Sequence, residues 1–142
     1  MLNHKLSRKA QLFLLGALLG VAIFLLVYGT APLNVANDAF CRGGYIEKDI
    51  QQHYAGWLFY KRSAIGWPLG VTDAVNYPGG VSVAYTDSIP LLAALCRPLA
   101  AALGGTFQYF GWFTLTSFAL QGGFGALLCG LFCESVPACA AG

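Results

Sequence analysis

The feature that most constrains this chain is a charge-free apolar run near its beginning, from Gln11 to Tyr28. With a rise of about 1.5 Å per residue, a helix of this length would span about 27 Å, close to the thickness of the hydrocarbon layer of a bilayer. Three basic residues come directly before it: Lys5, Arg8 and Lys9. The positive-inside rule therefore predicts a cytoplasmic basic tail over residues 1–10, followed by a transmembrane helix over residues 11–29.

The composition of the whole chain also indicates a membrane protein. Hydrophobic residues make up 57% and charged residues 10%, with a mean hydropathy of +0.62, whereas a soluble domain usually carries about 25% charged residues. The net charge of +2 and the lack of a basic stripe argue against nucleic-acid binding. A cleaved signal peptide is the alternative for the first run, but the small-residue cleavage site that it needs is poor around Tyr28.

Most of the polar residues lie between residues 30 and 87, which we expect to form an external loop. Within this loop the pattern predicts one amphipathic helix over residues 49–61, because Ile50, Tyr54, Trp57 and Leu58 recur at helical spacing. Asp49 followed three residues later by Gln52 resembles a capping box at the helix start. The aromatic residues and the Lys61–Arg62 pair are typical of a helix that lies in the headgroup layer.

Two further apolar segments follow the loop. Residues 88–104 are short for a span and contain Arg97, so we expect either a short transmembrane helix, with Arg97 reaching the inner headgroups, or a re-entrant or interfacial hairpin. Residues 106–133 carry no charge and are long enough for a tilted span. Residues 134–142 show no ordered pattern. The predicted fold class is an all-α membrane protein with about three transmembrane helices, one of them short.

The candidate functional residues lie in the external loop, because no local signature of a soluble enzyme is present. Asp49 is either a helix cap or a general base held at the membrane surface. His53, one turn later, is either a structural residue or part of the same site. Lys61 and Arg62 are suited to a lipid phosphate or to anionic headgroups. Asp87, at the start of the second apolar segment, is either a helix cap or a second acidic group.

The five cysteines do not predict a disulfide framework. Cys129 and Cys133 stand one helical turn apart, which is a possible metal-ligand spacing, but small buried apolar side chains are the better interpretation. No metal-ligand spacing is convincing, so the sequence gives no support for a divalent metal and predicts no other cofactor.

Four segments resemble a family of bacterial multi-pass membrane proteins that is similar to the GT-C glycosyltransferases. These segments are residues 49–57 (DIQQHYAGW), 76–80 (NYPGG), 85–92 (YTDSIPLL) and 108–111 (QYFG). GT-C enzymes transfer sugars from polyprenyl-phosphate donors, and their first external loop carries the catalytic acidic residue. By position, the resemblance implies that Asp49 is this base, although Ile50 stands where a second acidic residue is often found.

The resemblance implies the N-terminal segment of an inner-membrane glycosyltransferase that acts on an extracytoplasmic acceptor. Gln52 and His53 would position acceptor or donor, Asp87 would belong to the same substrate site, and Lys61 or Arg62 would bind the lipid phosphate. GT-C enzymes have many more spans, so we expect this chain alone to be inactive. The alternative is a non-enzymatic membrane protein that assembles or anchors partners; a transporter is disfavoured because no span carries an acidic residue at mid-depth.

Overall fold

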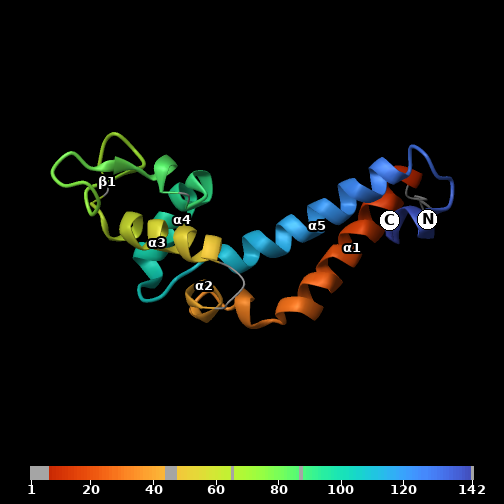
Figure 1. Cartoon of the computed structure of the whole chain (residues 1–142), viewed down its shortest axis with the longest axis horizontal. Coiled ribbons are helices and arrows are strands. Elements are labelled where there is room, and N and C mark those ends of the chain that lie inside the picture. Colours follow the sequence, from red (N-terminus) through yellow and green to blue (C-terminus); the bar gives the residue numbers. More distant parts are fainter. Residues whose placement is uncertain (1–6, 44–47, 65, 87, 142) are drawn as a thin grey trace, which may run out of the picture. The chain divides into compact units, whose positions relative to one another are not determined.

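The computed structural model describes residues 7–43, 48–64, 66–86 and 88–141, and the chain is mostly helical (Figure 1). It divides into two compact units. Unit 1 contains the residues up to Thr30 and those from Trp112 on, and unit 2 contains residues Ala31–Gly111. The elements are, in chain order, α1 (Arg8–Tyr28), η1 (Ala31–Leu33), α2 (Ala39–Arg42), α3 (Lys48–Arg62), β1 (Val71–Thr72), β2 (Val81–Ser82), η2 (Val83–Tyr85), α4 (Pro90–Leu103), α5 (Phe110–Cys129) and α6 (Val136–Ala141).

Helices α1 and α5 are the two helices in the described part of the chain that are long and apolar enough to cross a membrane. α1 begins after Ser7, whose hydroxyl accepts a hydrogen bond from the Ala10 amide at 3.4 Å, and ends at Gly29, which has a φ of 68°. Large apolar side chains stay uncovered along both helices, as at Leu26, which is 85% exposed. Such surfaces are favourable in hydrocarbon and unfavourable in water, so both helices have the character expected of membrane spans.

Within unit 1, α1 and α5 approach closely through glycines (Figure 1). A Cβ atom at Gly16 would overlap the carbonyl oxygen of Gly122, and one at Gly20 would overlap that of Phe118. Gly16 and Gly20 form a GxxxG pair, a pattern that allows two helix backbones to come together. Phe24 packs beside this contact, edge to face with Phe118 at a centroid distance of 5.9 Å.

The C-terminal end of α5 meets the N-terminal end of α1, so the two helices are antiparallel. The Arg8 guanidinium donates hydrogen bonds to the carbonyl oxygens of Gly130 and Cys133, at 3.2 and 2.6 Å. These bonds satisfy backbone groups that the end of a helix leaves free. Residues 134–142 were expected to lack order, yet α6 forms there, because Cys139 is buried beside Leu12 and Ala126.

Unit 2 has an aromatic core. Trp57 of α3 is fully buried, and its indole N–H donates a hydrogen bond of 2.9 Å to the Phe107 carbonyl. Tyr109 packs edge to face against Trp57 at a centroid distance of 5.0 Å. The aromatic residues of α3 that suggested a helix in the headgroup layer therefore pack in the core of unit 2. The position of α3 relative to a membrane stays a prediction.

The geometry of unit 2 depends on the segment 108–111, just before and at the start of α5. Gln108 is fully buried, and its side-chain amide donates hydrogen bonds to the carbonyls of Pro32 and Asn34, at 2.8 and 3.1 Å. Its side-chain oxygen accepts a bond of 3.1 Å from the Gly111 amide. A Cβ atom at Gly111 would overlap the Pro32 carbonyl oxygen, so glycine is needed there. Through these bonds, the last residues of unit 2 are held against its first residues.

Helix α4 occupies most of the segment over residues 88–104 that was expected to be a short transmembrane helix or a re-entrant or interfacial hairpin, and its position relative to a membrane stays a prediction. It has 14 residues, so it is about 21 Å long, less than the hydrocarbon thickness of about 30 Å. Arg97 is 6% exposed, lies 4.5 Å from the Tyr60 ring centroid on α3, and donates a hydrogen bond to the Ser63 carbonyl just after α3. The sequence did not indicate these partners within unit 2, because they meet Arg97 only through tertiary packing.

The segment between α3 and α4 contains a two-stranded antiparallel hairpin. Val71 pairs with Ser82 and Thr72 pairs with Val81. The connecting turn is closed at Gly80, whose amide donates a hydrogen bond of 2.9 Å to the Asn76 carbonyl. Gly80 has a φ of 70°, a value that glycine adopts without steric cost. The residues expected to form an external loop are thus part of one folded unit together with α4.

Candidate functional site: a basic pocket in unit 2

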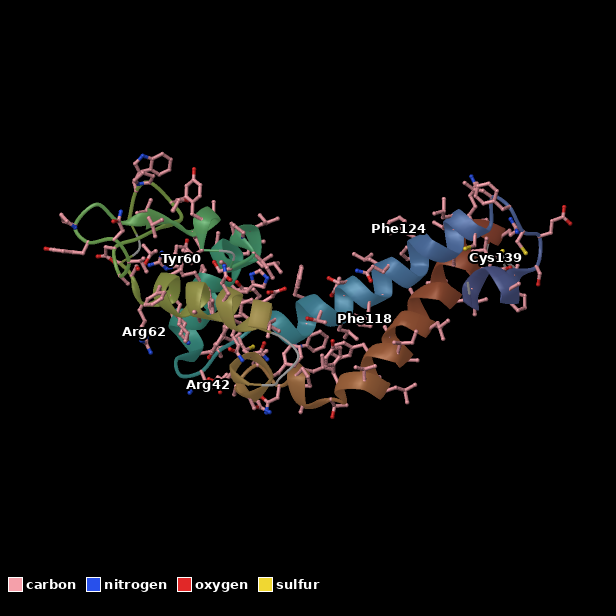
Figure 2. All side chains as sticks on the ribbon, viewed as in Figure 1. Arg42, Tyr60, Arg62, Phe118, Phe124 and Cys139 are labelled. Carbon is pink, nitrogen blue, oxygen red and sulfur yellow. The ribbon has the colours of Figure 1, made fainter. Side chains whose placement is uncertain are left out.

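A pocket of about 280 Å³ opens on unit 2, beside the C-terminal half of α3. Three cationic side chains line it, two of which, Arg42 and Arg62, extend on the lower side of the unit in Figure 2. The full lining consists of Arg42, Tyr54, Leu58, Lys61, Arg62, Ala100, Gly104, Gly105 and Thr106. The pocket therefore combines α2, α3, the end of α4 and the turn that follows it.

Helix α3 places its pocket residues by helical spacing. Tyr54, Leu58 and Lys61 follow one another at intervals of four and three residues, which puts them on one face of the helix. The Lys61 ammonium donates a hydrogen bond of 2.9 Å to the Gly105 carbonyl. Gly104 and Gly105 both have positive φ values, 64° and 63°, so this turn depends on glycine.

On the other side of the pocket, Asp38 holds Arg42 and Tyr54 in place. Its Oδ2 atom lies 2.5 Å from the Arg42 Nε atom and accepts a hydrogen bond of 2.8 Å from the Tyr54 hydroxyl. Burial alone would raise the pKa of Asp38, but the bonds from Tyr54 and Arg42 hold it below its ordinary value. Burial, followed by the bond to Asp38, raises the pKa of Tyr54 to about 12.

The pocket carries an excess of positive charge. Asp38 forms an ion pair with Arg42, whereas Lys61 is bonded to a neutral carbonyl. The pKa of Lys61 is lowered first by burial and then by the charge of Arg62. An anion bound here would counter both effects, because it stabilises the charged ammonium. Charged donors around a small cavity are suited to a phosphate or carboxylate group.

The structure separates the predicted site residues into two groups. Lys61 and Arg62 line the pocket, whereas Asp49, an exposed residue in the first turn of α3, does not. At about 100° per residue, Asp49 faces about 120° away from Lys61, and the two lie about 18 Å apart along the helix axis. Gln52 is exposed and is also absent from the pocket lining.

His53 lies away from the pocket and is only partly buried. Its Nδ1 atom is buried and has no hydrogen-bond partner among the described residues. The choice between a structural histidine and a site residue, which the sequence left open, stays a prediction. Asp87 lies outside the described residues; its neighbours Thr86 and Ser88 share a hydroxyl hydrogen bond of 3.0 Å.

Sequence reasoning missed Arg42, Asp38 and Tyr54 as site residues. One local signal could have found the first two: Asp38 and Arg42 are four residues apart, the spacing of a helical ion pair. No such signal links them to Lys61, because the pocket needs the packing of α2 against α3. Among the described residues there is no group of three or more metal-ligating side chains, so no residues can be assigned to a metal.

A comparison with protein families gives one match, which covers residues 17–142 and is described as a domain of unknown function, DUF6311. The chain belongs to the DUF6311 family. No curated protein matches it, and no solved structure does. The match includes the pocket, all the predicted site residues and most of α1, so these features are part of the DUF6311 domain.

Proposed function

We propose that this DUF6311 chain is a membrane-embedded segment that binds the phosphate group of a lipid-linked sugar in the basic pocket. The observation that carries the proposal is the convergence of Arg42, Lys61 and Arg62 on one cavity. In keeping with the resemblance to GT-C enzymes, the parent activity is the transfer of a sugar from a polyprenyl-phosphate donor to an extracytoplasmic acceptor. The chain alone is expected to be inactive in transfer.

The membrane placement rests on α1 and α5. Both have the length and composition of membrane spans, and basic residues at the start of α1 favour a cytoplasmic N-terminus. Unit 2 would then lie on the outer side of a bacterial inner membrane, where polyprenyl-linked donors present their phosphate. Among the described residues we propose two membrane spans, α1 and α5. Helix α4 has no spanning role in this proposal, because it is too short.

The pocket has the chemistry that a phosphate ester needs. Two guanidinium groups and one ammonium supply charged hydrogen-bond donors, which bind anions about twice as strongly as neutral donors do. Its volume of about 280 Å³ is at the lower end of the range of about 300–1,000 Å³ that is usual for small-molecule sites. A phosphate with part of a sugar is a ligand of suitable size and charge.

Binding can be tested with the full chain in lipid nanodiscs, by titrating a short-chain polyprenyl phosphate and the corresponding polyprenol. We expect the phosphate to bind more tightly, and Lys61→Ala to weaken its binding by about tenfold, because a charged hydrogen bond contributes about 1.5–3 kcal/mol. Lys9→Ala removes an equal charge from an exposed position in unit 1 and should leave binding unchanged. Equal affinity for phosphate and alcohol would contradict the proposal.

The position of Asp49 favours a second candidate function, a non-enzymatic protein that anchors or assembles partners by binding anionic lipids. A base about 18 Å along the helix from Lys61 is too far to act on a sugar whose phosphate sits in the pocket. A transfer assay on a longer DUF6311 protein distinguishes the two, because the anchoring function predicts no transfer. Where transfer occurs, Asp49→Asn tests the base: loss of transfer with normal membrane insertion supports Asp49, and retained transfer removes it.

A further inference from the structure

A row of leucines runs uncovered along α4. Leu91, Leu95, Leu99 and Leu103 recur at every fourth residue and are 73%, 65%, 49% and 59% exposed. The opposite face of the helix packs within unit 2, where Ala93, Arg97 and Ala100 are buried. We call the four leucines the leucine row. It is the solvent-directed face of a helix whose other face belongs to the core.

The rest of the uncovered surface of α4 is also apolar. Its other exposed residues are alanines and prolines: Pro90, Ala94, Pro98, Ala101 and Ala102. The one charged residue of the helix, Arg97, is buried. A helix face of this length without a polar side chain is unfavourable in water and marks a contact surface.

The chain connections indicate what this surface contacts. Unit 2 begins at Ala31, three residues after α1 ends, and its last residues, Phe110 and Gly111, are the first of α5. Both ends of the unit are therefore attached directly to helices that have the character of membrane spans. A unit tethered twice in this way stays beside the bilayer surface.

The charges near the C-terminal end of α4 complement a membrane that contains anionic lipids. The pocket with Arg42, Lys61 and Arg62 adjoins the C-terminal end of α4, where the Lys61 ammonium is bonded to the Gly105 carbonyl. No acidic residue occurs between Ser88 and Cys133. An apolar helix face with cationic side chains near one end suits a helix that lies in the interfacial plane of an anionic membrane.

We propose that α4 lies along the bilayer surface with the leucine row in the boundary between headgroups and acyl chains. The pocket at its end would then stand at the level of the lipid phosphates. This inference shares the membrane placement of the proposed function but does not depend on sugar transfer or on a polyprenyl ligand. Of the alternatives that the sequence left open for this segment, it selects the interfacial one and adds the residues that face the lipid.

The test is photocrosslinking of the full chain in nanodiscs of phosphatidylethanolamine and phosphatidylglycerol at a ratio of three to one. A benzophenone amino acid replaces Leu95 or Leu99 in turn, and Ala55, an exposed residue of α3, in the matched control. Intact mass identifies each adduct. We expect lipid adducts at both leucine positions, at least about fivefold more than at Ala55.

Two results would overturn the inference: lipid adducts at the leucine positions no more frequent than at Ala55, or adducts there with a second protein chain in place of lipid. Because both leucines are exposed, either replacement is compatible with the fold, and near-ultraviolet circular dichroism checks it. Failure of polyprenyl phosphate to bind would reject the proposed function while leaving the lipid adducts unaffected, so the two outcomes are distinguishable.

Discussion

The side chain of Gln108 bonds to carbonyl groups more than seventy positions earlier in the chain. Replacing it by alanine leaves two buried backbone groups without these bonds, the Pro32 carbonyl and the Gly111 amide, whereas the Asn34 carbonyl still accepts a hydrogen bond from the Asn37 amide. Each unsatisfied buried group costs about 1–3 kcal/mol, so we expect Gln108→Ala to destabilise unit 2 by at least about 2 kcal/mol. Hydrogen exchange over residues 31–42 measures the loss. Gln121→Ala, at an exposed position of α5, should leave this exchange unchanged.

Asp38 makes unit 2 sensitive to acid. Its pKa is lower in the folded chain than the ordinary value of 3.8, so its contribution to stability is present above about pH 4 and is lost as the pH falls through the folded pKa. We expect Asp38→Asn to be less stable than the wild type at pH 7 and the difference to shrink toward pH 3.

Thermal unfolding of the full chain in nanodiscs, followed by near-ultraviolet circular dichroism between pH 7 and pH 3, checks this expectation. Asp73→Asn, at an exposed side chain of the hairpin segment, should follow the wild type across the range. A difference between Asp38→Asn and the wild type that stays constant with pH would show that Asp38 acts through packing alone.

At the scale of elements, the pairing of α1 with α5 depends on the absence of side chains where the backbones meet. Gly16→Ala would place a methyl group against the Gly122 carbonyl, and such overpacking typically costs about 1–3 kcal/mol. Gly125→Ala is the matched control, because a Cβ atom there meets nothing within 4 Å. We expect a lower unfolding temperature for Gly16→Ala only; equal effects of the two would contradict this packing.

Helical periodicity located the amphipathic helix, which the structure places at Lys48–Arg62, because its apolar residues repeat locally. The same periodicity could not show what those residues pack against. Trp57 was assigned to the membrane surface, but it contacts Phe107, fifty residues later in the chain. Likewise, the sequence showed that Lys61 is basic, but it could not show that Lys61 and Arg42 line the same pocket, because this depends on tertiary packing.

At the scale of the whole molecule, the proposed orientation predicts which side of the membrane each part reaches. In a cysteine-free background, a cysteine at Ala55 should react with a membrane-impermeant maleimide applied from outside, whereas one at Ser135 should react only after the membrane is permeabilised. Both positions are exposed. Equal labelling of both in intact cells would contradict two spans with unit 2 outside.

The composition and the charge-free runs were enough to indicate a membrane protein, because partition into a bilayer depends on local sequence. The number of spans was harder to infer, since α4 is as apolar as a short span. Its one arginine, Arg97, is satisfied by the Tyr60 ring on α3 and by the Ser63 carbonyl just after α3, and these partners are visible only in the folded unit. The sequence pattern therefore predicted membrane association better than it predicted the path of the chain.

The hydrogen bond between Gln108 and Pro32 means that the segment between these two residues begins and ends at neighbouring points in space. A module with adjoining ends can be removed or exchanged without stretching whatever it is attached to. Related chains could therefore carry altogether different folded modules between these two positions, and a short glycine-containing bridge from residue 31 to residue 111 could reconnect the two hydrophobic helices.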